Sequence, residues 1–297
     1  MFRSRSLAQL ALSVALVVAA PSAVLAQEGS FDSAGVPIAY DDMGGDGDPV
    51  VLIHSFTSSS DMWTKAGFEQ SDDFRFIALD VRGHGQSGKP DDPEAYGVEM
   101  VEDVVRLMDH LELDDAHVAG YSMGAEIALK LATEYPDRVR SLVAGGSGWS
   151  PIEAYDVYSY AAMGFADAPT LGDSIRAVMP PEVGEDAITF LMAAMEQHGI
   201  DTDNEDTAAL ASVALSMDEL IPLAEEDVAA IDVPVLGIAS ENDSELPNIE
   251  RMDGIVSDFE LALIPAGPTG DPNLDHMGAT SDPLFHDSIM EFLSSQA

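Results

Sequence analysis

The sequence of 297 residues contains no cysteine. Disulfide bonds are therefore excluded, and the stability of the fold must come from packing. Positive charge is also scarce, because 12 lysines and arginines stand against 54 aspartates and glutamates, a formal net charge of -42. A surface this acidic repels nucleic acid phosphates and anionic lipid headgroups, which argues against both as partners.

The shortage of lysine extends to the whole chain, which has only Lys65, Lys89 and Lys130. Repulsion among the carboxylates destabilises the compact state at low ionic strength, and salt screens it within about 10 Å at 0.1 M. Two explanations fit this composition. The protein is adapted to seawater or stronger brine, or it is an acidic secreted protein whose charge serves solubility alone.

Long apolar runs are rare, and the clearest one, residues 7–20, lies near the N-terminus behind two arginines. Small residues follow and end at Ala26, which is the layout of a secretory signal peptide. The alternative is a membrane anchor, but a span needs about 20 apolar residues and Pro21 interrupts this one. We expect residues 1–26 to be cleaved. The product would be periplasmic or extracellular and would not insert into a membrane.

The remaining stretch of about 270 residues is long enough for one large α/β domain. Apolar runs typical of strands alternate along it with helical patterns, and several runs are almost continuously apolar, as in strands covered on both faces. The alternation predicts a mostly parallel, doubly wound sheet. The strand-like runs are 36–40, 49–55, 74–80, 117–121, 141–146, 233–240 and 259–265. The helical patterns are 96–112, 123–135 and 282–295, the last with Ser281 as its expected N-cap.

Residues 150–230 break this alternation, because they show helical patterns without a convincing strand. They predict a helical cap inserted between two parts of the core, residues 27–149 and 231–297. The cap is rich in methionine and aromatic residues, which either line an adaptable apolar pocket or form the core of the cap itself. The candidates for the substrate pocket are Trp149, Tyr121, Met163 and Met192.

A single serine stands between glycines where the hydrophobic rhythm changes from strand to helix. The stretch Gly120-Tyr121-Ser122-Met123-Gly124 matches the pattern G-x-S-x-G. A serine hydroxyl becomes a useful nucleophile only when it is exposed, activated by a base and faced by donors for the developing oxyanion. A tight turn between strand and helix presents it in this way, and the glycines avoid clashes there. The pattern predicts a nucleophile elbow at Ser122.

Four segments together resemble the α/β-hydrolase superfamily, in particular its bacterial esterase/lipase-like members. They are LIHSFTSSSDMW (52–63), LDVRGHGQSGKP (79–90), GYSMGAEIAL (120–129) and DHMGATSDPLFHDSIMEFL (275–293). The second is the most specific, because nothing general about α/β folds demands DxRGxGxS after a strand. The resemblance covers nearly all of the mature sequence and implies the α/β-hydrolase fold with a helical cap.

The resemblance also implies roles for individual residues. Ser122 would be the nucleophile, and the backbone N–H groups of Phe56 and Met123 would form the oxyanion hole. Ser55 replaces the glycine that the family usually has before the first donor. The acid should follow the strand 233–240. The candidates there are Glu241, Asp243 and Glu245, and the position used in the family selects Asp243.

The base of the family is a histidine after the last strand, and the chain contains seven histidines. His54 and His84 belong to the family's structural motifs and would support loops. The others away from the strand ends are His110, His117 and His198. His286 falls inside the terminal helix, whereas His276 lies in the loop before it and is followed by Met277-Gly278. The resemblance therefore selects His276.

These residues predict a secreted serine hydrolase that cleaves a small carboxylic ester with an apolar group, using neither cofactor nor metal. A lactonase, a C–C bond hydrolase and a cofactor-free perhydrolase or haloperoxidase use the same triad and remain alternatives. Serine at position 122 excludes the aspartate nucleophile of related dehalogenases and epoxide hydrolases. A weakly catalytic ligand-binding protein is an alternative of another class, and a displaced His276 would favour it. The oligomeric state stays open.

Overall fold

A computed structural model describes residues 27–151, 168–179, 184–198, 200–204, 206–220 and 222–296. The predicted signal peptide, residues 1–26, and the pocket candidate Met163 lie outside these ranges. All structural statements below refer to the described residues.

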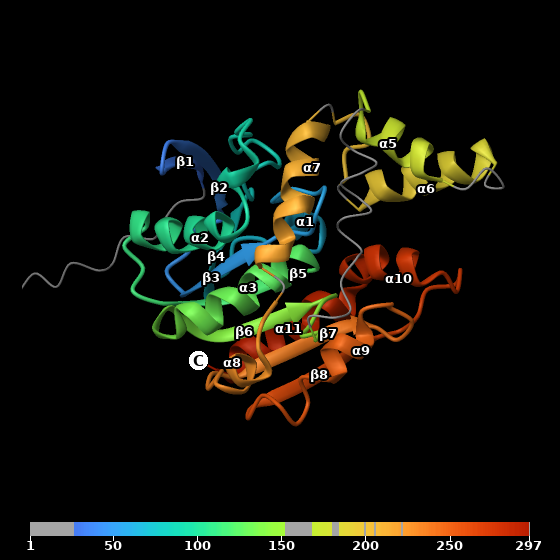
Figure 1. Cartoon of the computed structure of the whole chain (residues 1–297). Helices are drawn as coiled ribbons and strands as arrows, with labels where there is room; N and C mark the ends of the chain where they lie inside the picture. Colours follow the sequence, from blue (N-terminus) through green and yellow to red (C-terminus); the bar gives the residue numbers. More distant parts are fainter. Residues whose placement is uncertain are drawn as a thin grey trace, which may run out of the picture.

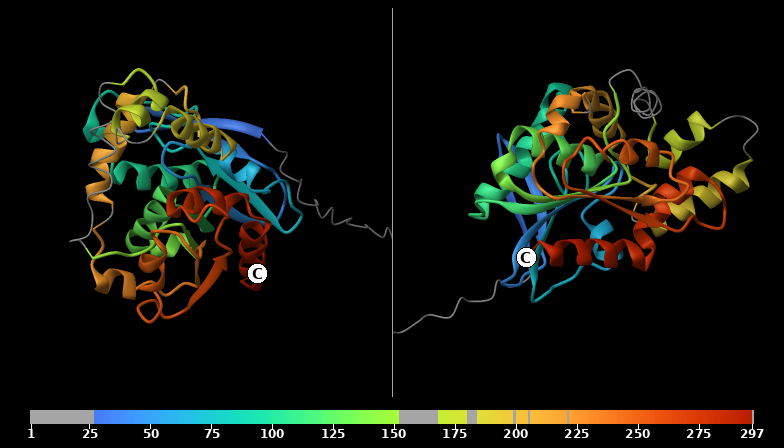
Figure 2. Two further views of the ribbon diagram at one scale, coloured as in Figure 1. Left: turned by 90° about the vertical axis from the view of Figure 1, so that its right-hand side faces the viewer. Right: turned by 90° about the horizontal axis from the view of Figure 1, so that it is seen from below.

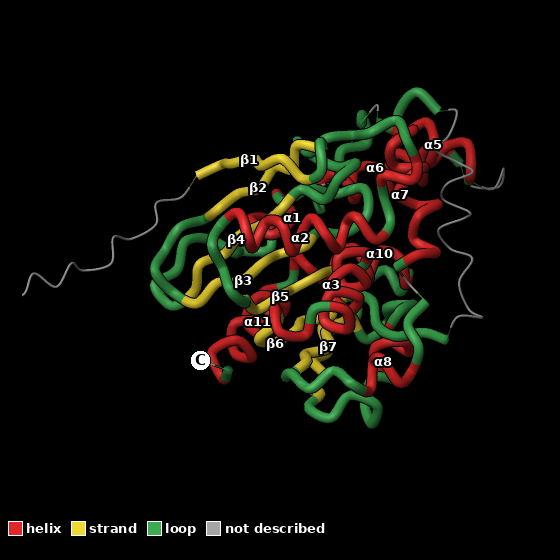
Figure 3. Tube along the Cα trace, turned by 60° about the vertical axis from the view of Figure 1, so that its left-hand side comes forward, coloured by secondary structure: helices red, strands yellow, loops and turns green. Residues whose placement is uncertain are grey.

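Eight strands form one sheet in the order β1-β2-β4-β3-β5-β6-β7-β8. The labels of Figure 3 follow this order from β1 to β7. Strands β1 and β2 pair antiparallel, as do β2 and β4, and all the other neighbours are parallel. The predicted mostly parallel sheet is confirmed. The strands are β1 Gln27–Ser33, β2 Val36–Asp42, β3 Asp48–Ile53, β4 Phe74–Leu79, β5 Ala116–Tyr121, β6 Val139–Gly145, β7 Val235–Ser240 and β8 Phe259–Ile264.

The helices follow the strands in the alternation that a doubly wound sheet requires. Ten α-helices are described (Figure 1). They are α1 Asp61–Lys65, α2 Val98–His110, α3 Met123–Glu134, α5 Leu171–Val178, α6 Glu185–Gln197, α7 Thr207–Ser216, α8 Glu225–Ala229, α9 Leu246–Glu250, α10 Pro272–Gly278 and α11 Pro283–Ser295.

Two hydrophobic clusters bury the two faces of the sheet. On one face, side chains of α2, α3 and α8 pack against strand residues such as Val51 and Val118. On the other face, Trp63 of α1 and Phe285 of α11 pack against Leu52 and neighbouring side chains. The right-hand view of Figure 2 shows α2 and α3 on one side of the sheet and α11 on the other. The central strands β3 to β7 are therefore covered on both faces, which explains the continuous apolar runs in the sequence.

Between β6 and β7 the described residues form helices α5 to α8 and contain no strand. Helices α5, α6 and α7 share a small core of their own around Leu171, Ile188 and Leu210. Phe56 of the β3–α1 loop and Met277 of α10 pack against this core from below. Figure 1 shows α5 and α6 together above α10, so the insertion stands over the loops that follow β3 and β8.

Three local expectations differ from the structure. Strand β1 was not predicted, because its sequence QEGSFDS is polar and places only Phe31 and Ser33 in buried positions. The N-cap of α11 is Asp282, whose carboxylate accepts the N–H of Leu284, and not Ser281. His276 lies in helix α10 and not in a loop. An aspartate competes well with serine for an N-cap, and Pro at the next position starts the helix.

Candidate active site

Ser122 occupies a strained turn between β5 and α3. Its backbone has φ 53° and ψ -118°, a conformation that L-residues rarely adopt. A Cβ on Gly120 would lie 2.0 Å from the carbonyl oxygen of Gly124, and one on Gly124 would lie 2.1 Å from that of Ile53. Both glycines are therefore required by the close approach of backbone to backbone. The turn holds the serine partly exposed at the carboxyl end of the sheet.

Ser122, His276 and Asp243 form a connected set of hydrogen bonds. His276 Nε2 lies 3.1 Å from Ser122 Oγ, and His276 Nδ1 lies 2.9 Å from Asp243 Oδ2. When Nδ1 carries the proton and donates it to the carboxylate, Nε2 is free to accept the serine proton. The structure thus brings together the three side chains that the resemblance selected from distant parts of the sequence.

The three carboxylates that follow β7, the candidates for the acid of the triad, have different surroundings. Asp243 is 4% exposed, and its Oδ1 accepts the N–H of Glu245 at 2.9 Å, which leaves Oδ2 for His276. Glu241 is exposed. The side chain of Glu245 accepts from Asn248 Nδ2 at 2.7 Å. Only Asp243 of these three therefore contacts the histidine.

His54 fixes the loop that contains Ser55 and Phe56. The N–H of Val81 donates to His54 Nε2 at 3.0 Å, so Nδ1 carries the ring proton and donates it to the carbonyl of Ser55 at 2.7 Å. Burial lowers the pKa of His54, which keeps the ring neutral as this tautomer requires. Ser55 has a negative φ, unlike Thr57 at φ 64°, so the family's glycine is not needed at position 55.

Asp80 ties the DxRGxGxS segment to the same loop. Its carboxylate accepts the N–H groups of Ser60 at 2.8 Å and Gln86 at 2.7 Å. A Cβ on Gly85 would lie 2.3 Å from the Asp80 carboxylate, which explains the second glycine of the motif. The hydroxyl of Ser87 donates to the carbonyl of Asp80. The motif therefore fastens the turn after β4 to the loop after β3.

The arginine of that motif is buried in an ion pair. Arg82 is 1% exposed and donates to Asp103 of α2 through Nε at 2.6 Å and Nη2 at 2.5 Å. Its third contact is the carbonyl of Ala95. Ser33 Oγ of β1 also donates to Asp103, so the pair joins the motif to α2 and to the edge of the sheet. This arrangement is structural, and neither side chain contacts the triad.

Met123 and Phe56, the predicted oxyanion donors, lie on two different elements, helix α3 and the β3–α1 loop. Met123 is the first residue of α3, and the N–H groups of a helix's first turn have no acceptor within the helix. The partial positive charge of the helix N-terminus adds to their ability to stabilise an anion. Phe56 is partly buried, and its ring lies edge-on to His84 at 5.7 Å.

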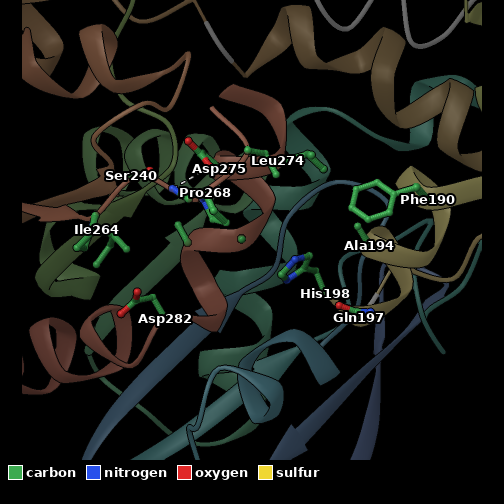
Figure 4. A pocket seen from close by; sticks show the side chains of 15 residues that line it. Phe190, Ala194, Gln197, His198, Ser240, Ile264, Pro268, Leu274, Asp275 and Asp282 are labelled. Carbon is green, nitrogen blue, oxygen red and sulfur yellow. Dashed lines mark hydrogen bonds between the residues drawn. The ribbon is translucent and has the colours of Figure 1, made fainter. Parts of the chain in front are cut away.

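Two described cavities border the histidine's helix. One of about 400 Å³ lies between α6 and α10, with Phe190, Ala194 and His198 on one side and Leu274 and Asp275 on the other (Figure 4). The other, of about 20 Å³, lies directly at the site. It is lined by Ser55, Met62, Tyr121, His198, Ile200, His276, Met277 and Thr280. The shared residue, His198, places the end of α6 beside the catalytic candidates.

The pocket candidates fall in different places. Tyr121 is 2% exposed and lines the small cavity, and its hydroxyl donates to the carbonyl of His276 at 2.5 Å. Trp149 does not line these two cavities. It belongs to the core on one face of the sheet, where its indole N–H donates to the carbonyl of Leu223 at 2.9 Å. Met192 packs against the insertion's own core, which helices standing off the sheet need for their stability. Trp149 and Met192 thus have packing positions among the described residues, and their place in a substrate pocket stays a prediction.

The remaining histidines have other surroundings. His117 Nδ1 lies 2.7 Å from Ser141 Oγ inside the sheet, and His110 stacks on Phe31. His286 packs edge-on against Phe68, away from the triad. His198 is the exception to the sequence analysis, because it lines both cavities and lies 2.9 Å from Ser281 Oγ.

Three residues near the triad were not singled out for their contacts by sequence reasoning. Asp275 is 4% exposed and accepts from Asn242 Nδ2 at 2.9 Å and from the N–H of Gly267 at 3.0 Å. Tyr121 holds the carbonyl of His276. The only signal in the sequence is their position, since each of Tyr121, Asn242 and Asp275 immediately precedes a member of the triad.

No group of three or more His, Asp or Glu side chains in these ranges is arranged to hold a metal ion. No helix among the described elements is long and apolar enough to cross a membrane.

Comparisons with known proteins match this chain in part of its length. The family model described as the alpha/beta hydrolase fold matches residues 48–179. The chain is 36% identical over 114 residues to the dihydrolipoyllysine-residue acetyltransferase component of the acetoin cleaving system of Cupriavidus necator, covering 37% of this chain and 29% of that protein. It is 40% identical over 96 residues to "Probable lysophospholipase BODYGUARD 4" of Arabidopsis thaliana, covering 31% of this chain and 23% of that one. The matches span about a quarter of the relatives' lengths.

Solved structures match almost the whole fold. The enol-lactonase from Burkholderia xenovorans LB400 superposes with a TM-score of 0.72 at 21% identity, covering 90% of this chain and 100% of the other. A thermophilic esterase from Thermogutta terrifontis gives 0.71 at 24% identity, covering 91% and 99%. Together with the sheet order and the elbow, these matches show that the chain has the α/β-hydrolase fold.

Proposed function

We propose that this protein hydrolyses carboxylic esters with Ser122 as nucleophile, His276 as base and Asp243 as the acid that orients it. The observation that carries the proposal is the unbroken chain of contacts from Ser122 Oγ through the imidazole to Asp243. A displaced His276 would have favoured a ligand-binding protein. At 3.1 Å the imidazole is within hydrogen-bonding distance of the hydroxyl, which supports an enzyme.

The reaction follows from the roles of these three side chains. His276 Nε2 takes the proton of Ser122 Oγ as that oxygen attacks the ester carbonyl, and Asp243 stabilises the imidazolium that forms. The C–O bond to the alcohol breaks when the imidazolium returns its proton to the leaving oxygen. Water then attacks the acyl-enzyme, with His276 again as base, and releases the acid and free Ser122.

The tetrahedral oxyanion needs donors, and we assign them to the backbone N–H groups of Met123 and Phe56. Met123 opens α3, and Phe56 lies on the loop that His54 and Asp80 hold. Each donor of this kind contributes roughly 3–4 kcal/mol in comparable sites. Rigid support of the Phe56 loop is valuable because donors must be in place before the charge develops.

The substrate class is inferred from the insertion over the site. Its core places Phe56 and Met277 against apolar side chains of α5 to α7, and Phe190 of α6 is 63% exposed beside the larger cavity. An exposed aromatic ring next to a cavity suits an apolar acyl or alcohol group. The name of one relative, a probable lysophospholipase, is in line with such a substrate.

A panel of p-nitrophenyl esters of graded acyl length tests the proposal. We expect turnover by the protein from residue 27 onward and a loss of at least about 10³-fold in kcat for Ser122→Ala. Ser150→Ala is a control, since it removes the hydroxyl of a buried serine that lies outside the triad. Activity that survives Ser122→Ala would rule out the mechanism. Turnover of lactones in preference to every open ester would move the substrate class to the lactonase alternative.

We also propose that the protein is exported and that cleavage follows Ala26. The support is the layout of residues 1–26, two arginines followed by an apolar run and small residues. N-terminal sequencing of the protein recovered outside the cytoplasm should begin at Gln27. A protein that retains Met1 in the membrane fraction would contradict the cleavage.

A further inference from the structure

The residue before each member of the triad takes part in a second set of contacts. Tyr121 precedes Ser122, Asn242 precedes Asp243 and Asp275 precedes His276. The Tyr121 hydroxyl donates to the carbonyl of His276, and Asn242 Nδ2 donates to Asp275 Oδ2 at 2.9 Å. The end of β5, the loop after β7 and helix α10 are thus joined to one another next to the catalytic contacts.

Asp275 is the centre of this second set. It is 4% exposed, and its two oxygens have different partners, with Oδ2 accepting from Asn242 and Oδ1 accepting the N–H of Gly267 at 3.0 Å. A Cβ on Gly267 would lie 2.4 Å from Asp275 Oδ1, so the glycine allows the close approach. A buried carboxylate with both oxygens engaged holds its backbone in one place.

The long β8–α10 connection makes this contact necessary. Residues 265–271 are largely exposed, and apart from the Gly267–Asp275 bond the connection reaches His276 through the first turn of α10. Asp243 is fixed by its own loop through the N–H of Glu245. The separation of His276 Nδ1 and Asp243 Oδ2 therefore depends on how α10 is tied to the loop of Asp243, and the Asn242–Asp275 bond is that tie.

We propose that Asn242 and Asp275 are positioning residues that set the His276–Asp243 hydrogen bond. This inference rests on the proposed ester hydrolysis for its effect on rate. Tyr121 complements the pair from the other side, because burial, with the charge of Asp243 adding to it, raises the pKa of its phenol and keeps the hydroxyl a donor to the His276 carbonyl.

A charge swap tests the proposal. In Asn242→Asp two carboxylates face each other where an amide met a carboxylate, and their repulsion pushes the two loops apart. We expect kcat to fall by about 10- to 100-fold with a smaller change in KM, because a small misplacement of a catalytic group costs about this much. In the double variant Asn242→Asp/Asp275→Asn the amide at 275 again donates across the contact and accepts the N–H of Gly267. Its kcat should return to within about threefold of the wild type.

Asn248→Asp is the matched control. It also places a carboxylate against a carboxylate, that of Glu245, but this pair lies at the start of α9 and does not touch α10. We expect its kcat to stay within about twofold of the wild type. A fall in Asn248→Asp equal to that in Asn242→Asp would overturn the proposal, because the effect would then be general to the loop.

A second measurement is independent of turnover. The Nδ1 proton of His276, bonded to Asp243, should give a low-field proton resonance that is absent in His276→Gln. We expect it to disappear in Asn242→Asp, to return in the double variant and to persist in Asn248→Asp. If no ester is hydrolysed but the resonance follows this pattern, the proposed function fails and the positioning role stands. If esters are hydrolysed while Asn242→Asp keeps both its kcat and the resonance, the positioning role fails.

Discussion

At the scale of single residues, the site depends on which nitrogen of each histidine carries a proton. His276 donates from Nδ1 to Asp243 and accepts at Nε2, whereas His54 donates from Nδ1 to a backbone carbonyl and accepts a backbone N–H at Nε2. The two rings have the same tautomer but different partners. Only the ring with a hydroxyl at its acceptor nitrogen can act as a base.

The first residue-scale prediction concerns Asp243. In Asp243→Asn the amide no longer selects the tautomer with a proton on Nδ1, so Nε2 is not held ready as an acceptor. We expect kcat for a p-nitrophenyl ester to fall by about 10⁴-fold with the fold unchanged by circular dichroism. Glu241→Gln, in the same loop but exposed, is the control and should keep the wild-type kcat. Equal losses in both variants would contradict the assignment of the acid.

The second residue-scale prediction concerns His84, which is buried and lies edge-on to Phe56. Burial, reinforced by His54, lowers the pKa of His84 well below its ordinary value. A histidine with a lowered folded-state pKa contributes stability that is present above the unfolded value near 6.5 and is lost as the pH falls through the range below it. His84→Gln removes this contribution.

Urea unfolding at pH 7.5, 6.5 and 5.5 measures the difference in the free energy of unfolding between the wild type and His84→Gln. Below pH 6.5 the free energy of unfolding of the wild type should fall more steeply than that of His84→Gln, by up to about 1.4 kcal/mol per pH unit. Acidic groups titrate in both proteins, so comparing the two slopes isolates the histidine. Parallel slopes would show that His84 gains a proton without cost.

At the scale of elements, the joint between β5 and α3 carries the most demanding geometry. Sequence alone predicted this joint, because G-x-S-x-G lies where period-2 apolar residues give way to helical spacing. It also predicted seven of the eight strands, since buried parallel strands are continuously apolar. Strand β1 was missed because an edge strand with one buried face needs few apolar residues, here mainly Phe31.

The site was predictable only as far as a resemblance could select residues. Ser122, Asp243 and His276 followed from motif and chain order. The contacts of Tyr121, Asn242 and Asp275 depend on how the end of β5, the loop after β7 and helix α10 meet, which no local pattern records. Helix α10 had a usable signal that was overlooked. Its Asp271-Pro272 start is the same N-cap and N1 pair as Asp282-Pro283 in α11.

An element-scale prediction follows from the clash at Gly124. In Gly124→Ala the new methyl group would meet the carbonyl of Ile53, and α3 cannot retreat without opening the core beneath it. We expect a loss of about 1–3 kcal/mol in the free energy of unfolding, together with impaired ester turnover. Gly184→Ala, which has open space around it, should change stability by less than about 0.5 kcal/mol. Urea titrations measure the free energy of unfolding of both variants. Equal values for Gly124→Ala and Gly184→Ala would contradict the packing argument.

At the scale of the whole molecule, charge dominates. Most described arginines and lysines already have a carboxylate partner, such as Asp42 for Arg75, Asp109 for Arg138 and Glu134 for Lys130. With 54 acidic residues against 12 basic ones, most carboxylates have no such partner and repel one another. Counterions from the solvent have to supply the positive charge that the chain lacks.

We therefore predict that salt stabilises the fold. Between 0.02 M and 1 M NaCl the unfolding midpoint should rise by about 4–8 °C, equivalent to about 2 kcal/mol for a domain of this size. Screening is nearly complete at a few tenths molar, so the rise should be steep at first and then flatten. Differential scanning calorimetry across this range gives the curve. A midpoint indifferent to salt would leave solubility as the explanation of the acidic composition.

The insertion between β6 and β7 has a consequence for how such proteins diverge. The groups assigned to the chemistry lie on loops and helices that follow strands of the sheet, whereas helices α5 to α7 have a core of their own. Selection for a new substrate can therefore act on residues 150–230 without disturbing the machinery beneath. Among close homologues we expect amino-acid replacements to accumulate fastest in this segment. Differences in its sequence would then reflect changes of substrate, whereas the sequence of the sheet would reflect common ancestry.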